Sequence, residues 1–215
     1  MFMESIVMAS SARIWDRFAD RYEKAKVKDE ETYLAKLKKT QEFLAPEMEV
    51  LEFGCGTGTT ALHHSPHVKH ILATDISAKM LGHGERKAKE QGITNVTFKQ
   101  TAIEDLNAEG KVFDAILALN ILHLLEDRET VIKHMYDLLK PGGVFISSTP
   151  ALNDTLPWLK FILPIGQLFG RIPYVTFFKK AELRQSFVDR GFEMEHEWNT
   201  NKNGVLFAVA RKPDQ

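Results

Sequence analysis

The chain has 215 residues, of which 44% are hydrophobic and 27% charged, a composition typical of an ordinary soluble globular protein with one good core. Lys plus Arg (28) nearly balances Asp plus Glu (29), so the charge disfavours nucleic acid as a partner. The single cysteine excludes an internal disulfide and a cysteine zinc site. The N-terminus has an acid before its apolar residues and no long uncharged segment, so we expect no secretory signal and a cytoplasmic protein.

In chain order, residues 10–45 have apolar side chains at helical spacing and predict two polar helices, the second ended by Pro46. Short apolar segments then alternate with helical ones. Strands are expected at 49–54, 70–75, 95–101, 113–120 and 144–149. Helices are expected after the first strand, at 77–92 with Gly92 as the stop, and from the N-cap Asp127 to the terminator Pro141-Gly142-Gly143. This alternation predicts a parallel sheet covered on both faces.

The end of the chain follows another pattern. The strand-like segments "GFEMEHEWNT" and "GVLFAVARK" are joined by "NKNG", a turn signal, and predict an antiparallel hairpin. The fold class is therefore α/β: a doubly wound, mostly parallel, seven-stranded Rossmann-like sheet with a C-terminal antiparallel hairpin and N-terminal helices.

Three glycines, Gly54, Gly56 and Gly58, follow the first apolar strand. In a doubly wound sheet, ligands bind beyond the carboxyl ends of the strands, where glycine permits positive φ and a close approach to the backbone. A tight strand–helix turn without a ligand is the alternative. A dinucleotide fingerprint would need glycine where Thr59 stands, and no lysine follows to make a phosphate-binding P-loop. Glu52, two residues before the first glycine, suits a ligand that carries an ammonium group.

Together these segments resemble class I S-adenosylmethionine-dependent methyltransferases. The resemblance rests on "LEFGCGTG" (51–58), "ATDIS" (73–77), "NILHLLED" (120–127) and "LKPGGVFISS" (139–148), in the family's order and spacing, and covers about 45–150 and the hairpin by pattern. It implies S-adenosylmethionine as cofactor and S-adenosylhomocysteine as product.

The resemblance implies a role for individual residues. Asp75 would accept the ribose hydroxyls, with a helix N-cap as the alternative, and Ile76 and Met80 would lie against the adenine, with core packing as the alternative. Ala102 and Ile103 align with residues that read the adenine edge, but Ala102 cannot accept a hydrogen bond from the exocyclic amine, which puts base selectivity in doubt. The full set of expected cofactor-binding residues is Tyr22, Glu52, Phe53, Gly54, Gly56, Gly58, Asp75, Ile76, Met80, Ala102, Ile103, Leu119 and Asn120.

The remaining assignments concern the methionine end of the cofactor, a candidate base, the cysteine and the histidines. The backbone near Leu119 and Asn120 would take the methionine ammonium. Tyr22 resembles the aromatic residue that family members lay over the cofactor, and a tyrosine that anchors its helix is an equal alternative. His123 is the candidate general base, against a plain loop histidine. We interpret Cys55 as a small buried residue, and we predict no metal site among the histidines at 63, 64, 67 and 70 because Pro66 interrupts them and no acid accompanies them.

The segment 156–180 is the most apolar and aromatic part of the chain. It predicts either a core-filling pair of helices or an apolar acceptor pocket or lid, which could touch a membrane surface through 156–178. We therefore expect one domain, 1–215, with a helical cap (1–45), a cofactor-binding core (46–150), an apolar substrate-side insertion (151–180), and a terminal helix and hairpin (181–215).

The expected function is methyl transfer to a small lipophilic or aromatic acceptor, with no nucleic-acid partner. A protein or nucleic-acid methyltransferase is the first alternative, although the chain has neither an [Asn/Asp]-Pro-Pro-aromatic motif after the fourth strand nor a basic face. A non-catalytic module that binds S-adenosylmethionine is the second.

Overall fold

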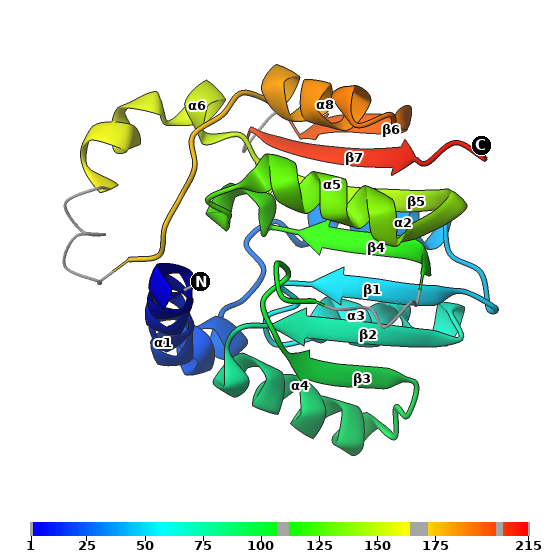
Figure 1. Ribbon diagram of the computed structural model, residues 1–215. Helices are drawn as coiled ribbons and strands as arrows, with labels where there is room; N and C mark the ends of the chain where they lie inside the picture. Colours follow the sequence, from blue (N-terminus) through cyan, green and yellow to red (C-terminus); the bar gives the residue numbers. More distant parts are fainter. Residues whose placement is uncertain (1, 107–111, 164–171, 201–203, 215) are drawn as a thin grey trace. The chain divides into compact units, whose positions relative to one another are not determined.

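Seven strands flanked by helices form a mixed, mostly parallel sheet in the computed structural model, which describes residues 2–106, 112–163, 172–200 and 204–214 (Figure 1). The chain divides into two compact units, 1–106 and 107–215. The first unit contributes strands in the order β3-β2-β1 and the second in the order β4-β5-β7-β6. The predicted fold class is confirmed, and the prediction of a single domain stays a prediction.

The first unit contains three parallel strands, β1 (Glu49–Phe53), β2 (His70–Asp75) and β3 (Val96–Gln100). Its helices are α1 (Phe2–Lys24), α2 (Glu30–Gln41), α3 (Thr59–His64), the 3-10 turn η1 (Ser65–His67) and α4 (Ala78–Gln91). The register pairs Phe53 with Thr74, so β1 and β2 end side by side. The glycine loop and Asp75, which follow from these two ends, are thereby brought to one edge of the sheet.

Two helix ends in this unit test the sequence interpretation. Helix α4 begins after Ser77, whose side-chain oxygen accepts a hydrogen bond from Met80 N at 3.1 Å, and it stops at Gly92 with a φ of +67°. The predicted stop is confirmed. The alternative role of Asp75 as the helix N-cap is wrong, because Ser77 takes that position. Helix α1 begins at Phe2, earlier than the expected residue 10.

The second unit contains β4 (Phe113–Leu119), β5 (Leu139–Pro150), β6 (Glu193–Thr200) and β7 (Val205–Arg211). Its helical segments are η2 (Leu122–Leu124), α5 (Arg128–Leu138), α6 (Leu152–Thr155), η3 (Pro157–Phe161) and α8 (Lys180–Asp189). Strands β4 and β5 are parallel, whereas β7 runs antiparallel to both β5 and β6. The predicted hairpin is confirmed, and residues 201–203 of its turn lie outside the described residues.

Helix α5 begins as predicted, because the Asp127 side chain accepts a hydrogen bond from Thr130 N at 3.0 Å. Its predicted terminator is wrong: the helix ends at Leu138, and Pro141-Gly142-Gly143 lie inside β5. The reason is long-range pairing. Gly142 N donates to Lys212 O at 3.0 Å and Lys212 N donates to Gly143 O at 2.9 Å, so the end of the chain draws this segment into the sheet.

Candidate functional site

The glycine loop of the first unit has the backbone that its sequence predicts. Gly54, Gly56 and Gly58 have φ values of +62°, +54° and +72°, which disfavour residues with a Cβ. Cys55 N donates to Thr74 O at 2.9 Å, which holds the loop against the end of β2. The loop therefore presents bare backbone at the carboxyl edge of the parallel strands.

The close approach of a ligand is not the only reason why this loop needs glycine. A Cβ at Gly58 would lie 2.5 Å from Cε1 of Phe98, and one at Gly84 would lie 2.6 Å from the same atom. Packing of the Phe98 ring therefore excludes a side chain at Gly58. A Cβ at Gly56 would lie 3.7 Å from its nearest neighbour, Tyr22 Cε1, which is an ordinary contact. The positive φ is therefore the reason for glycine at this position.

Asp75 ends β2 and faces the same loop. Its Oδ2 accepts a hydrogen bond from Gly56 N and its Oδ1 accepts one from Ser77 N, each at 2.9 Å. Burial raises the pKa of Asp75, and the bonds from the Ser77 and Gly56 amides partly offset that rise. Because a carboxylate offers about four lone-pair positions, Asp75 retains capacity to accept hydrogen bonds from a ligand.

Glu52 is the most unusual group of the site. Its residue is only 2% exposed, and its Oε2 is buried with no hydrogen-bond partner in the described part of the chain. Burial, followed by the negative charge of Asp75, raises the pKa of Glu52 to about 8. A buried carboxyl without a partner costs free energy, and a cationic or hydrogen-bond-donating ligand would remove that cost.

Two tyrosines of the N-terminal helices lie near these carboxyls. The ring of Tyr22, on α1, lies beside Gly56, and 52% of this residue stays exposed. Desolvation and then the charge of Asp75 raise the pKa of Tyr22, and desolvation raises that of Tyr33, on α2, where the charge of Glu52 also acts. The sequence analysis included Tyr22 but missed Tyr33, which sits in a polar helix with no motif to mark it.

An apolar wall follows Asp75. Met80, Ala102 and Ile103 are buried, and Ile76 is half-buried. Thr101 N donates to the carbonyl of Asp75 at 3.1 Å, which brings the residues after β3 to the end of β2. The burial of Met80 also agrees with the core-packing alternative. Phe53 is buried too, so only its backbone is available to a ligand.

The remaining predicted residues belong to the second unit. Asn120, directly after Leu119 and β4, is exposed and has a φ of +58°, the one positive φ of a non-glycine residue in the described part of the chain. Its amide donates to Ser148 O at 2.7 Å, which fixes this conformation. Unusual backbone of this kind is concentrated at functional sites, so the geometry supports a role for the 119–120 backbone.

His123 occupies the short η2 segment beyond Asn120. Burial lowers its pKa to about 4, and its Nδ1 has no partner among the described residues. The carbonyl oxygen of His123 accepts hydrogen bonds from Thr176 N at 2.7 Å and Thr176 Oγ1 at 3.2 Å, which attach the last part of the apolar insertion to this turn. The ring is neutral near pH 7 and therefore able to accept a proton, although its low pKa makes it a weak base.

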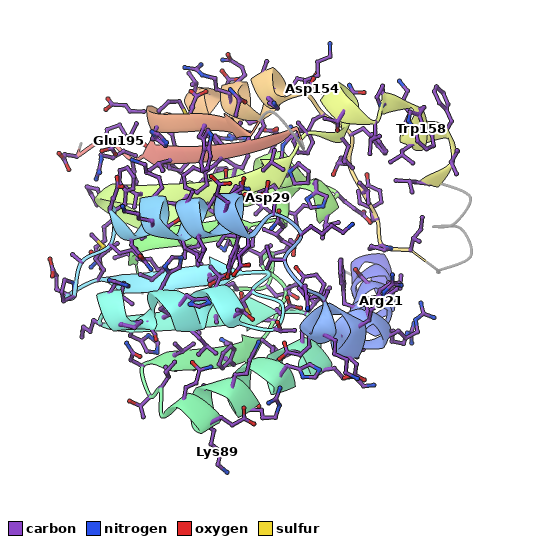
Figure 2. The ribbon with its side chains drawn as sticks, turned by 180° about the vertical axis from the view of Figure 1, so that it is seen from behind. Arg21, Asp29, Lys89, Asp154, Trp158 and Glu195 are labelled. Atoms are coloured by element: carbon purple, nitrogen blue, oxygen red, sulfur yellow. The ribbon has the colours of Figure 1, made fainter. Side chains whose placement is uncertain are left out.

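An exposed apolar turn occupies the start of the insertion. Leu156, Trp158, Phe161 and Ile162 are exposed, Phe161 by 73%, and Figure 2 shows Trp158 on this turn. Lys160 Nζ lies 5.2 Å from the centre of the Phe161 ring. The core-filling alternative is wrong for 156–162, because these side chains do not reach the core. Residues 164–171 lie outside the described residues.

Two side chains considered for chemistry are buried. Cys55 is buried as predicted, and burial raises the pKa of its thiol well above the usual range, so the thiol is unreactive. His64 is buried in α3 with neither ring nitrogen bonded within the described part of the chain, and burial lowers its pKa to about 4. Among the described residues, no group of His, Cys, Asp and Glu has a metal-binding arrangement.

Comparison with known proteins shows that this chain is similar to methyltransferases. Residues 50–143 match the model of a methyltransferase domain. The uncharacterized methyltransferase YcgJ of Bacillus subtilis is 33% identical over 128 residues, which are 60% of this chain and 50% of YcgJ. These matches support the resemblance of the chain to the class I S-adenosylmethionine-dependent methyltransferases.

One further curated relative and one solved structure extend the match. A ubiquinone biosynthesis O-methyltransferase of Rickettsia canadensis is 25% identical over 171 residues, 77% of this chain and 69% of that protein. The solved complex of DhpI with SAH aligns with a TM-score of 0.76 and 23% identity, covering 97% of this chain and 98% of that one. The chain spans only 50 to 69% of the length of these two curated relatives. The likeness to this solved structure supports the Rossmann-like fold.

Proposed function

We propose that the protein transfers a methyl group from S-adenosylmethionine to a small lipophilic or aromatic acceptor. One observation carries the proposal: four groups meet at one edge of the first unit. They are the buried Glu52 carboxyl with its unbonded Oε2, the bare backbone at Gly56, the Asp75 carboxylate and the Tyr22 ring. The match of residues 50–143 to the model of a methyltransferase domain supports the reaction class.

The residues present fit the chemical groups of S-adenosylmethionine. Asp75 has the remaining acceptor capacity for ribose hydroxyls. The apolar side chains of Ile76, Met80 and Ile103, which follow β2 and β3, are of the kind that suits a flat adenine ring. The unbonded oxygen of Glu52 suits the positive charge of the methionine part. Ala102 offers no side-chain acceptor to the adenine amine, so a backbone group would have to read the base.

Bound S-adenosylmethionine supplies a methyl group on a positively charged sulfur, which is already activated for transfer. The residues of this chain therefore have to bind, orient and exclude water rather than generate a nucleophile. Tyr22 covers Gly56 on the exposed side of the loop. A general base is needed only where the acceptor is weakly acidic, and His123, with a pKa of about 4, would be a weak base in that role.

A lipophilic acceptor is supported by the exposed apolar turn of residues 156–162. Apolar side chains left in water are characteristic of a surface that binds apolar ligands or partners. The name of the Rickettsia relative, which refers to ubiquinone biosynthesis, supports the same class of acceptor. Contact of 156–178 with a membrane surface is part of the proposal. None of the helices in the described part of the chain has the length and apolarity to cross a bilayer.

Calorimetry and methyl transfer test the function together. We expect S-adenosylmethionine and S-adenosylhomocysteine to bind and NADH and ATP not to bind. With methyl-labelled cofactor, a panel of quinone precursors, lipids and aromatic metabolites should acquire label, whereas charged polar metabolites, proteins and nucleic acids should not. Label on polar acceptors only would refute the lipophilic assignment, and cofactor binding without any labelled product would favour a non-catalytic module.

Replacing Asp75 with alanine should weaken S-adenosylhomocysteine binding by about 1–3 kcal/mol, the cost of losing hydrogen bonds to a charged acceptor. Titration calorimetry measures the effect. Asp105→Ala is the matched control, since Asp105 is an exposed carboxylate in the same unit, and it should bind like the parent. Equal affinities of the Asp75 variant and the parent would mean that the ribose binds elsewhere.

A further inference from the structure

A second set of contacts links helix α1 to the glycine loop. Lys87 Nζ, from α4, lies 2.9 Å from Glu23 Oε2, 2.7 Å from Thr59 Oγ1 and 3.4 Å from Thr57 Oγ1. The Lys87 and Glu23 side chains are only 14% and 18% exposed, and Thr57 is buried. One ammonium group therefore joins α1, α4, the loop and the first turn of α3.

The two ends of this contact are sequence neighbours of Tyr22 and Gly56. Glu23 directly follows Tyr22 on α1, and Thr57 directly follows Gly56 in the loop. Tyr22 lies beside Gly56, while Glu23 reaches Thr57 and Thr59 through Lys87. Two adjacent residues of the helix are thus matched to two adjacent residues of the loop. Since half of Tyr22 is exposed, its ring is less restrained by packing than a core aromatic would be.

Other polar contacts attach the same face of α1 to α4 without reaching the loop. Asp16 Oδ1 accepts from Ser77 Oγ at 2.6 Å and from Lys79 N at 3.2 Å, and Asp20 Oδ1 lies 3.0 Å from His83 Nε2. These contacts fix the helix along its length. The pair of Glu23 and Lys87 is the part of this interface that also touches the residues of the cofactor loop.

The Glu23 carboxyl is ionised at neutral pH. Burial raises the pKa of Glu23, but the hydrogen bond and positive charge of Lys87 outweigh it, so the pKa is lowered overall. A partly buried pair with hydroxyl partners is worth more than an exposed one, because solvent screens it less.

We propose that Glu23 and Lys87 are positioning residues that hold Tyr22 over the glycine loop and thereby slow the release of the bound cofactor. The inference rests on the proposed function, since it assigns these residues to the S-adenosylmethionine site. Neither residue touches the reacting atoms. Their effect passes through Tyr22, whose ring is placed by the turn of α1 that the ion pair anchors.

The test combines release kinetics with a double-mutant cycle. Lys87→Met removes the ammonium and keeps most of the aliphatic stem. We expect it to raise the dissociation rate of S-adenosylhomocysteine by roughly 5- to 150-fold, the usual range for coupling between sites. Tyr22→Ala should have a comparable effect, and Lys87→Met should add little in the Tyr22→Ala background. Lys89→Met, on the outer part of the same helix in Figure 2, should leave the rate unchanged.

A cofactor-free measurement separates positioning from general stability. In the unliganded protein, Lys87→Met should speed amide hydrogen exchange at residues 18–24 and leave exchange in β1 and β2 unchanged. Faster exchange throughout the first unit would indicate a merely structural role and overturn the inference.

Two kinetic outcomes would also overturn the inference while leaving the proposed function intact: an unchanged dissociation rate, or additive effects of Tyr22→Ala and Lys87→Met. A parent protein that does not bind S-adenosylhomocysteine at all would overturn both.

Discussion

Glu52→Gln is expected to stabilise the cofactor-free protein while weakening cofactor binding. The pKa of Glu52 is about 8 in the folded protein and near its ordinary value of 4.5 when unfolded. At pH 7 the unfolded chain gains free energy by ionising this group, and the folded protein does not. The penalty is about 3 kcal/mol at pH 7, and glutamine removes it at the smaller cost of burying an amide.

The pH dependence identifies the cause. Because the folded pKa is raised, the stability that Glu52 contributes is full below pH 4.5 and is lost as the pH rises toward 8. The unfolding free energies of parent and Glu52→Gln, measured by denaturant titration, should therefore differ most at pH 8 and least near pH 4.5. Glu49→Gln, on the same strand, is the control and should not stabilise the protein, since Glu49 pairs with Lys69 at 2.8 Å. A difference that does not vary with pH would contradict the prediction.

His64 should destabilise the protein in acid. Its pKa is about 4 in the folded protein against 6.5 for an ordinary histidine, because burial excludes the charged ring. The unfolded chain binds the proton first, so stability is lost as the pH falls from 6.5 to 4, by about 3 kcal/mol in total. His64→Met should remove this loss, so that the variant gains stability relative to the parent as the pH is lowered.

Comparison of variant and parent at each pH is essential here, since Glu52 acts in the opposite direction over the same range. His67→Gln is the control, because His67 lies three residues away and is exposed. It removes only the smaller effect of the His67 charge on the pKa of His64 and keeps the burial, so it should retain most of the acid loss. If His64→Met shows the same loss of stability between pH 7 and pH 4.5 as the parent, another group governs the acid response.

The alternation of apolar strands and helices was enough to predict the fold, because a parallel sheet covered by helices leaves that pattern in the sequence. Local signals at Ser77–Gly92 and at Asp127 also placed helix ends correctly. The terminator of α5 was misplaced because Gly142 and Gly143 pair with Lys212, about 70 positions away. Local turn chemistry carries no information about such a partner.

The candidate site was predictable where a motif marks it. Glu52, the glycines and Asp75 occupy positions with a recognisable spacing, and the structure places them at one edge of the first unit. Tyr33, Glu23 and Lys87 had no such mark. Each sits in a polar helix among similar residues, and the contact of Glu23 with Lys87 spans 64 positions. Only the packing of α1 on α4 reveals that these side chains are near the loop.

The Phe98 ring, wedged against Gly58 and Gly84, has a consequence for how the glycine motif is understood. The third glycine is required by the architecture that supports the loop, and it would be required even in a relative that had lost its ligand. A chain could thus keep this glycine through evolution after abandoning catalysis. The presence of Glu52 is a better indicator of a working site. Its buried, unbonded Oε2 lowers the stability of the ligand-free protein, and only a bound ligand compensates for that cost.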